Sequence, residues 1–142
     1  MNLFVAGFIG SPAMNLIPVT VSEKSATVYV QNSGFKISLP EAMAAKTKAS
    51  GVKDFIFGVR PEDIIKKGTG EATAIMSEPV PAHVNVIETL GREINLDVTI
   101  GDDTMTAIVS PNTTVEVGEA LELEINMDKV HLFIKDDGQA IF

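Results

Sequence analysis

The chain of 142 residues contains no cysteine, only two histidines, and 11 Lys and Arg against 19 Asp and Glu. Without cysteine it can form no disulfide, no thiolate metal site and no cysteine nucleophile. The histidines, His83 and His131, lie far apart in the sequence and offer little basis for histidine catalysis or a zinc site. The formal charge of −8 argues against nucleic acid as a partner, because binding phosphates requires a basic surface.

Long apolar runs and nucleotide-binding motifs are also missing. No run approaches the roughly 20 apolar residues that span a bilayer, and the first residues lack the Lys and Arg of a signal peptide. Lys66-Lys67-Gly68 lacks the rest of a phosphate-binding loop, so we expect no ATP hydrolysis by this chain. The spacing offers no nucleophile–base pair or paired carboxylates, and we predict no catalytic, cofactor-binding or metal-binding residue.

What the sequence has is alternation of apolar and polar residues. Residues 1–13 first predict a short helix, with Asn2 as N-cap, Phe4 and Phe8 on one face and Gly10 near its end. From Met14 onward the period is two, which is typical of β-strands with one wet face. The strands that this pattern predicts lie around residues 26–31, 35–39, 55–59, 94–100, 105–109, 121–127 and 130–134.

These strands indicate an all-β fold. With a further strand around 84–90, about five strands fall between Pro81 and Phe142, which is the size of a small oligonucleotide/oligosaccharide-binding (OB) barrel. Pro79 and Pro81 should keep Val80 out of a central strand, so we place the joint between two lobes there. The predicted organisation is a helix over 1–13, a small β lobe over 14–80 and an OB-like barrel over 81–142.

The segment Pro40–Gly51 interrupts the strands. Its alanines favour a helix that starts after Pro40 and ends at Gly51, although a thin apolar stripe leaves an irregular loop open. Asp102-Asp103 and Asp136-Asp137 stand beside glycines, and turn formation explains them better than cation binding.

Two further features suggest contacts. Glu88 shares the parity of Val84, Val86 and Leu90, which should be the buried side of a strand, so its carboxylate needs a backbone partner at the barrel rim or another chain. Arg60 and Glu62 flank Pro61, which stops a strand; they can form a structural ion pair at the lobe junction or contact another subunit.

Four motifs occur in the order in which a known family carries them: Phe4–Asn15, Gly58–Glu62, Val86–Gly91 and His131–Phe133. They resemble the C-terminal regulatory domain of the ATP-binding subunits of sugar-importing ABC transporters of the maltose-importer type. The resemblance covers nearly the whole chain, and Ser11-Pro12-x-Met14-Asn15 is its most specific motif. The position that many relatives fill with His after Arg-Pro-Glu is Asp63 here.

The resemblance implies an all-β, OB-like fold of the kind seen in molybdate-binding (MOP-like) and transport-associated (TOBE) domains. The ATPase domain, with its ATP and Mg, would precede Met1 and is not in this chain. Two copies would pair and hold the ATPase halves together. The full protein would be cytoplasmic, at the inner face of the membrane, with permease subunits and a regulatory protein as partners.

Residues that contact a second copy should lie in a neutral or apolar patch of the surface, because two copies with a charge of −8 each repel each other. The candidates are Ser11, Pro12, Met14, Asn15, Arg60, Pro61, Glu62, Glu88 and Gly91. Two other functions stay open. One is a small-ligand module that binds an oxyanion or a sugar, and the other is an enzyme with a cleft that joins Glu88 to a histidine.

Overall fold

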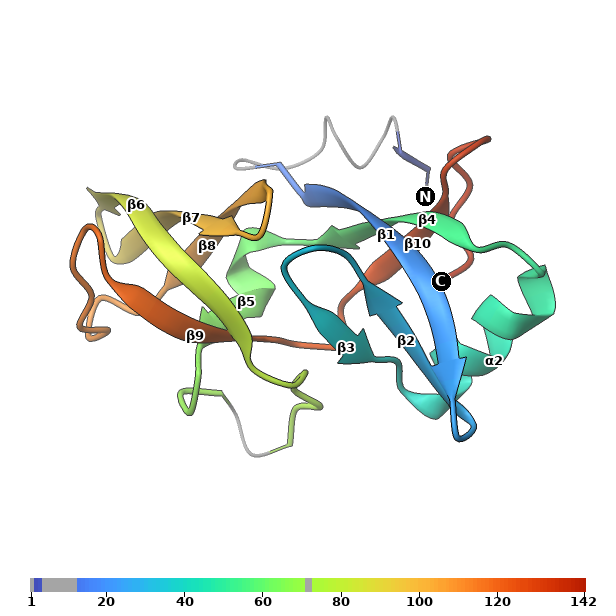
Figure 1. Cartoon of the computed structure of the whole chain (residues 1–142). Helices are drawn as coiled ribbons and strands as arrows, with labels where there is room; N and C mark the ends of the chain where they lie inside the picture. The colour runs from blue at the N-terminus through green and yellow to red at the C-terminus, as the bar shows by residue number, and fades with distance from the viewer. Residues whose placement is uncertain (1, 4–12, 71–72) are drawn as a thin grey trace.

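A computed structural model describes residues 2–3, 13–70 and 73–142 of the chain (Figure 1). The helix expected over residues 1–13 lies almost entirely outside the described residues, as do the candidates Ser11 and Pro12. The remaining chain is built from strands, one α-helix and one 3₁₀ turn. Their bounds are β1 Asn15–Lys24, β2 Thr27–Gln31, β3 Lys36–Ser38, α2 Glu41–Ser50, β4 Asp54–Val59, η1 Pro61–Asp63, β5 Ile64–Lys66, β6 Val80–Leu90, β7 Glu93–Ile100, β8 Asp103–Val109, β9 Ala120–Ile125 and β10 His131–Ile134.

The strands form two antiparallel five-stranded sheets that lie side by side (Figure 1). The first has the order β10-β4-β1-β2-β3, and the second has the order β5-β9-β6-β7-β8. One continuous core of buried residues, from Ile17 to Leu132, draws side chains from both sheets. The all-β fold class predicted from the alternation is therefore confirmed.

The first sheet contains the hairpin that the sequence predicted. Val28, Val30, Phe35 and Ile37 are buried, and β2 pairs with β3 across the turn at residues 32–35. The helix α2 is confirmed as well: Gly51 ends it in the left-handed conformation at φ 68°, and its N–H donates to the Lys48 carbonyl. In the described part of the chain, no helix has the length and apolar character to cross a membrane.

The lobe boundaries differ from the prediction. The strand around 130–134 is β10, which leaves the barrel and pairs with β4 of the first sheet. Leu132 of β10 faces the shared core, while Phe133 is buried on the other side against Met14. A strand buried on both faces cannot stand at a wet barrel wall. We therefore define the first lobe as residues 14–59 and 130–142, and the second lobe as residues 60–129.

The expectation that Pro79 and Pro81 keep Val80 out of a central strand is wrong, because Val80 and Pro81 begin β6, the central strand of the second sheet. At this end β6 pairs with β9 alone, and pairing with β7 starts at His83. A proline is tolerated in the first residues of a strand where one side has no neighbour.

Candidate functional site

Asn15 lies beside the start of the Arg60–Glu62 turn, at the junction of the two lobes, and Met14 precedes it in the chain. Asn15 opens β1 and stands opposite Val59, the last residue of β4, so the chain reaches Arg60 beside it. Glu88 and Gly91 lie elsewhere, in the distal part of β6 and in the turn to β7. The structure thus joins two of the predicted groups and leaves the third apart.

Met14 has a packing role at the junction. It is 5% exposed and contacts the buried ring of Phe133. Gly58 provides the room, since a Cβ there would lie 2.7 Å from both the Met14 sulfur and the Phe133 ring. Met14 is therefore a core residue. A partner protein could contact its side chain only if that side chain left the core.

Asn15 binds the second lobe through its side chain. Its Nδ2 donates to the Thr106 carbonyl at 2.9 Å and to the Val59 carbonyl at 3.2 Å, and its Oδ1 accepts the Thr106 N–H at 2.8 Å. The Asn15 amide thus forms hydrogen bonds with both the N–H and the carbonyl of Thr106 and links β1 to β8. A half-buried amide with three such bonds is a structural link between the lobes.

Arg60 and Glu62 form no ion pair with each other or with any other described residue. Pro61 is buried and starts the 3₁₀ turn η1, in which the Asp63 N–H donates to the Arg60 carbonyl at 3.0 Å. Residues two apart in such a turn do not share a face. The expected structural ion pair is therefore wrong, and the exposed Glu62 carboxylate is left without an intramolecular cation among the described residues.

Asp63 follows in the same turn and has a raised pKa. Burial of its carboxyl is the main cause and the neighbouring Glu62 charge adds to it, while Lys129, Arg60 and His131 oppose the rise. Asp63 also lines an open hollow of about 350 Å³ together with Glu62, Thr69, Gly70 and Asn126, among others. Two carboxylates at one wall make this hollow a poor place for an anion.

Glu88 is exposed, which contradicts the buried side expected from its parity. A β-bulge between Val84 and Val86 adds one residue to β6 and reverses the inward parity beyond it. As a result Val86, Glu88 and Leu90 point outward, and Ile87 is the half-buried residue. Gly91 opens the two-residue turn to β7 at φ 60°, which suits a tight hairpin.

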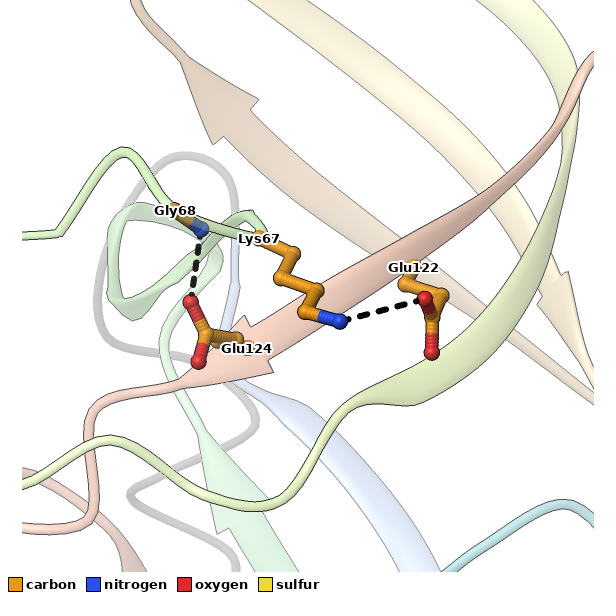
Figure 2. Close-up of polar contacts among 4 residues, drawn as sticks. All are labelled: Lys67, Gly68, Glu122 and Glu124. Carbon is orange, nitrogen blue, oxygen red and sulfur yellow. Dashed lines mark hydrogen bonds and ion pairs between the residues drawn. The ribbon is translucent and has the colours of Figure 1, made fainter.

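The acidic outer side of β9 is partly neutralised by the turn after β5 (Figure 2). The Glu124 carboxylate accepts the Gly68 N–H at 2.8 Å, and the Lys67 ammonium lies 3.4 Å from Glu122. Both pairs are exposed, so their contribution to stability is small.

A contact between two hairpin turns was missed by sequence reasoning. Gly34, between β2 and β3, touches Gly101, between β7 and β8, so closely that a Cβ on either would lie within 2.8 Å of the other turn's backbone. The Asp102 N–H donates to the Ser33 hydroxyl at 3.3 Å, and Asn32 Nδ2 donates to Asp103 at 3.2 Å. The sequence predicts both turns, but nothing in it indicates that the two turns contact each other.

The remaining predicted residues have ordinary surroundings. His83 is exposed on β6, and His131 Nδ1 lies 3.1 Å from the Phe142 carbonyl. Asp137 accepts the Gln139 N–H at 2.9 Å, as a turn residue does. In residues 2–3, 13–70 and 73–142, no three His, Asp or Glu side chains gather in a way that could hold a metal ion.

Comparison with known proteins matches one family model to each lobe. The MalK OB fold domain matches residues 10–64, and the TOBE domain matches residues 78–132. The first range covers β1 to β4 and ends at the first residue of β5, and the second covers β6 to β9 and the first two residues of β10.

Curated relatives align with almost the entire chain. The multiple sugar-binding transport ATP-binding protein MsmK of Streptococcus mutans is 37% identical over 99% of this chain and 37% of its own length. The trehalose/maltose import ATP-binding protein MalK of Thermococcus litoralis is 32% identical over 99% of this chain and 38% of its own length. The chain thus spans well under half the length of these relatives.

A solved structure, the cytoplasmic molybdate-binding protein ModG, has a similar fold. Its TM-score is 0.60 at 16% identity, and the match covers 83% of this chain and 94% of ModG. The OB-like and MOP-like fold class is thereby confirmed. The chain belongs to the family of OB-fold and TOBE domains found in the ATP-binding subunits of sugar-importing ABC transporters of the maltose-importer type.

Proposed function

We propose that the chain is a non-catalytic regulatory and dimerisation domain of the ATPase subunit of a carbohydrate importer. The observation that carries this proposal is the alignment of the whole chain with sugar-transport ATP-binding proteins, through an OB domain and a TOBE domain in succession. ATP and Mg then belong to a separate ATPase domain, and this chain itself needs no cofactor. In the complete protein, this domain lies on the cytoplasmic side and reaches the permease through the ATPase.

A stiff support suits that role. The two sheets share one core, and the Asn15–Thr106 bonds and the Gly34–Gly101 contact fix the lobes to each other. A close-packed junction of this kind transmits displacement rather than absorbing it. A domain that holds two ATPase halves together through a cycle needs this stiffness.

The Arg60–Glu62 turn is the best candidate for contact with a twin. It carries one cation and one anion that do not pair within the described chain. A two-fold axis beside the turn lets Arg60 of each copy bind Glu62 of the other, which makes the patch self-complementary. This local neutrality offsets the repulsion between two copies that each carry a charge of −8.

Charge-swap variants of the complete ATPase subunit test this contact. Arg60→Glu and Glu62→Arg should each weaken the nucleotide-free dimer, and the double swap should restore it. Sedimentation equilibrium gives the dissociation constants, and deletion of the 142 residues should abolish the nucleotide-free dimer. A dimer that is equally strong without these residues would refute the proposed dimerisation role.

A small-ligand module is the second candidate, and the fold shared with ModG is what favours it. The hollow beside Asp63 does not fit an oxyanion, because Glu62 and Asp63 line it. Calorimetry with molybdate, sulfate and maltodextrin decides the question. Micromolar binding of any of these would replace the dimerisation proposal, and no heat would remove the ligand alternative.

A further inference from the structure

We propose that residues 86–90 of β6 form an open sheet edge that binds an extended strand of a partner protein, one face of which carries side chains in the order apolar, basic, apolar. This inference goes beyond the proposed function, since it requires neither the twin nor the ATPase domain. It rests on the pairing of β6, on the side chains that the bulge turns outward, and on the charge between them.

The distal part of β6 has a neighbour on one side. β9 pairs with β6 from Val80 to His83, and next to it the Val84 N–H donates to the Glu119 carbonyl at 2.9 Å while the Gly118 N–H donates to the Val84 carbonyl at 2.8 Å. Beyond Val84, β6 continues to Leu90 with β7 as its one strand partner in the described part of the chain. Figure 1 shows this end of β6 at the left margin of the molecule. Unpaired backbone groups at such an edge are a template for another strand.

Apolar side chains gather at this edge. Val86 is 50% exposed, Leu90 is 49% exposed, and Val117, the neighbour of Gly118, is 65% exposed. Among the described residues, these are three of the four large hydrophobic side chains that are exposed; the fourth is Ile75. Exposed apolar side chains beside an unpaired strand edge favour the addition of another strand.

The charge between the apolar side chains selects the partner. Glu88 stands between Val86 and Leu90 and forms no ion pair in the described part of the chain, and Glu116 and Glu119 lie in the adjoining loop. A Lys or Arg on the incoming strand would neutralise Glu88.

A second copy of this chain fits the edge less well. Antiparallel pairing that sets Val86 against Leu90 of the other copy also sets Glu88 against Glu88. Like charges directly opposite each other destabilise a strand pair. An incoming strand with the order apolar, basic, apolar at every second residue keeps both apolar contacts and removes this repulsion.

The test uses two synthetic peptides, acetyl-Thr-Val-Thr-Lys-Thr-Val-Thr-amide, which places Val, Lys and Val on one face of a strand, and the same peptide with Glu in place of Lys. At millimolar concentrations, the Lys peptide should slow amide hydrogen exchange within residues 86–90, measured by NMR, and the Glu peptide should not. Equal exchange rates with and without the Lys peptide would overturn the proposal.

A charge-reversal variant adds a specific readout. Glu88→Lys should weaken binding of the Lys peptide about five-fold, as expected for a cross-strand charge pair, and should gain binding of the Glu peptide. Asp136→Lys, which makes the same change in net charge in the first lobe, is the matched control and should change the affinity for the Lys peptide less than two-fold. Equal effects of the two variants would show general charge attraction and overturn the assignment to this edge.

Self-association is measured on the same samples. Slower exchange at residues 86–90 that grows with protein concentration alone would identify a second copy as the occupant and overturn the partner proposed here. Failure of the charge swap at Arg60 and Glu62 would leave this result untouched, because the peptide experiment needs no dimer.

Discussion

The two lobes are both built on five-stranded antiparallel sheets, yet their surfaces differ. The first lobe carries six basic and five acidic residues, whereas the second carries five basic and 14 acidic ones. All the large hydrophobic side chains that are exposed among the described residues also belong to the second lobe. The first lobe is therefore nearly neutral, and the second carries most of the negative charge together with the distal part of β6. Both contacts proposed above, the Arg60–Glu62 turn and the β6 edge, thus fall in the second lobe.

The largest expected effect concerns the contact between the lobes at Gly101. Gly101→Ala should destabilise the protein by about 2–4 kcal/mol, because a left-handed residue gains a Cβ and that Cβ meets the backbone of Gly34. Urea unfolding measures the loss.

Gly91→Ala is the matched control for this change. Gly91 has nearly the same φ, 60° against 62°, but open space around the added Cβ. We expect it to cost about 1–2 kcal/mol from backbone strain alone. Equal losses for the two variants would mean that the turn contact does not hold the lobes together.

A smaller effect is expected at the second link between the lobes. Asn15→Ala should cost about 2–3 kcal/mol, because it leaves the Thr106 N–H and carbonyl without their partner. Asn85→Ala, which removes one exposed bond to Thr99, should change stability by about 0.5 kcal/mol or less. Thermal or urea unfolding of both variants compares a bond between lobes with a bond inside one.

The hairpin turns give a third comparison, with a gain in stability. β1 and β2 of the first lobe are joined by Ser25 and Ala26 at φ 52° and 68°, whereas glycines begin the turns at 91 and 101 of the second. Replacing Ser25-Ala26 by Asn-Gly should stabilise the protein by about 1–2 kcal/mol, since both new residues tolerate positive φ. An unchanged denaturation midpoint would show that the substitutions lower the free energy of the unfolded chain as much as that of the folded protein.

The smallest effect depends on pH. Because the pKa of Asp63 is raised in the folded protein, folding favours its protonated form, and stability falls as pH rises from the ordinary value of 3.8 through the raised pKa. Asp63→Asn should therefore be more stable than the natural protein at neutral pH, and the difference should vanish below pH 3.8. Glu62→Gln removes the neighbouring charge that helps to raise the pKa of Asp63. The pH-dependent loss of stability should therefore end at a lower pH in this variant. A difference in melting temperature that is independent of pH would contradict the assignment.

The sequence predicted local structure well and failed where a residue's neighbours come from elsewhere in the chain. The hairpin β2–β3 and the helix α2 follow from period, turn residues and a terminal glycine, all of which act within a few residues. The outward position of Glu88 depends on a bulge that the alternation of Val84 and Val86 hides. The pairing of β10 with β4 depends on Phe133 finding Met14, more than a hundred residues away.

The candidate residues divide in the same way. The motif residues Met14 and Asn15 are important, but their roles are burial and backbone bonding, which the motif alone cannot distinguish from a contact with another protein. The sequence predicted the turn at Arg60–Glu62. Only the 3₁₀ geometry of the structure shows that its two charged side chains form no ion pair with each other.

The alternating pattern by itself determined that this chain forms antiparallel strands with one apolar face, because burial of that face dominates the free energy of folding. The tertiary structure decided which strands share a sheet, which glycines touch and which edge of β6 stays open. Those outcomes depend on packing between segments that are distant in sequence, and no local pattern encodes them.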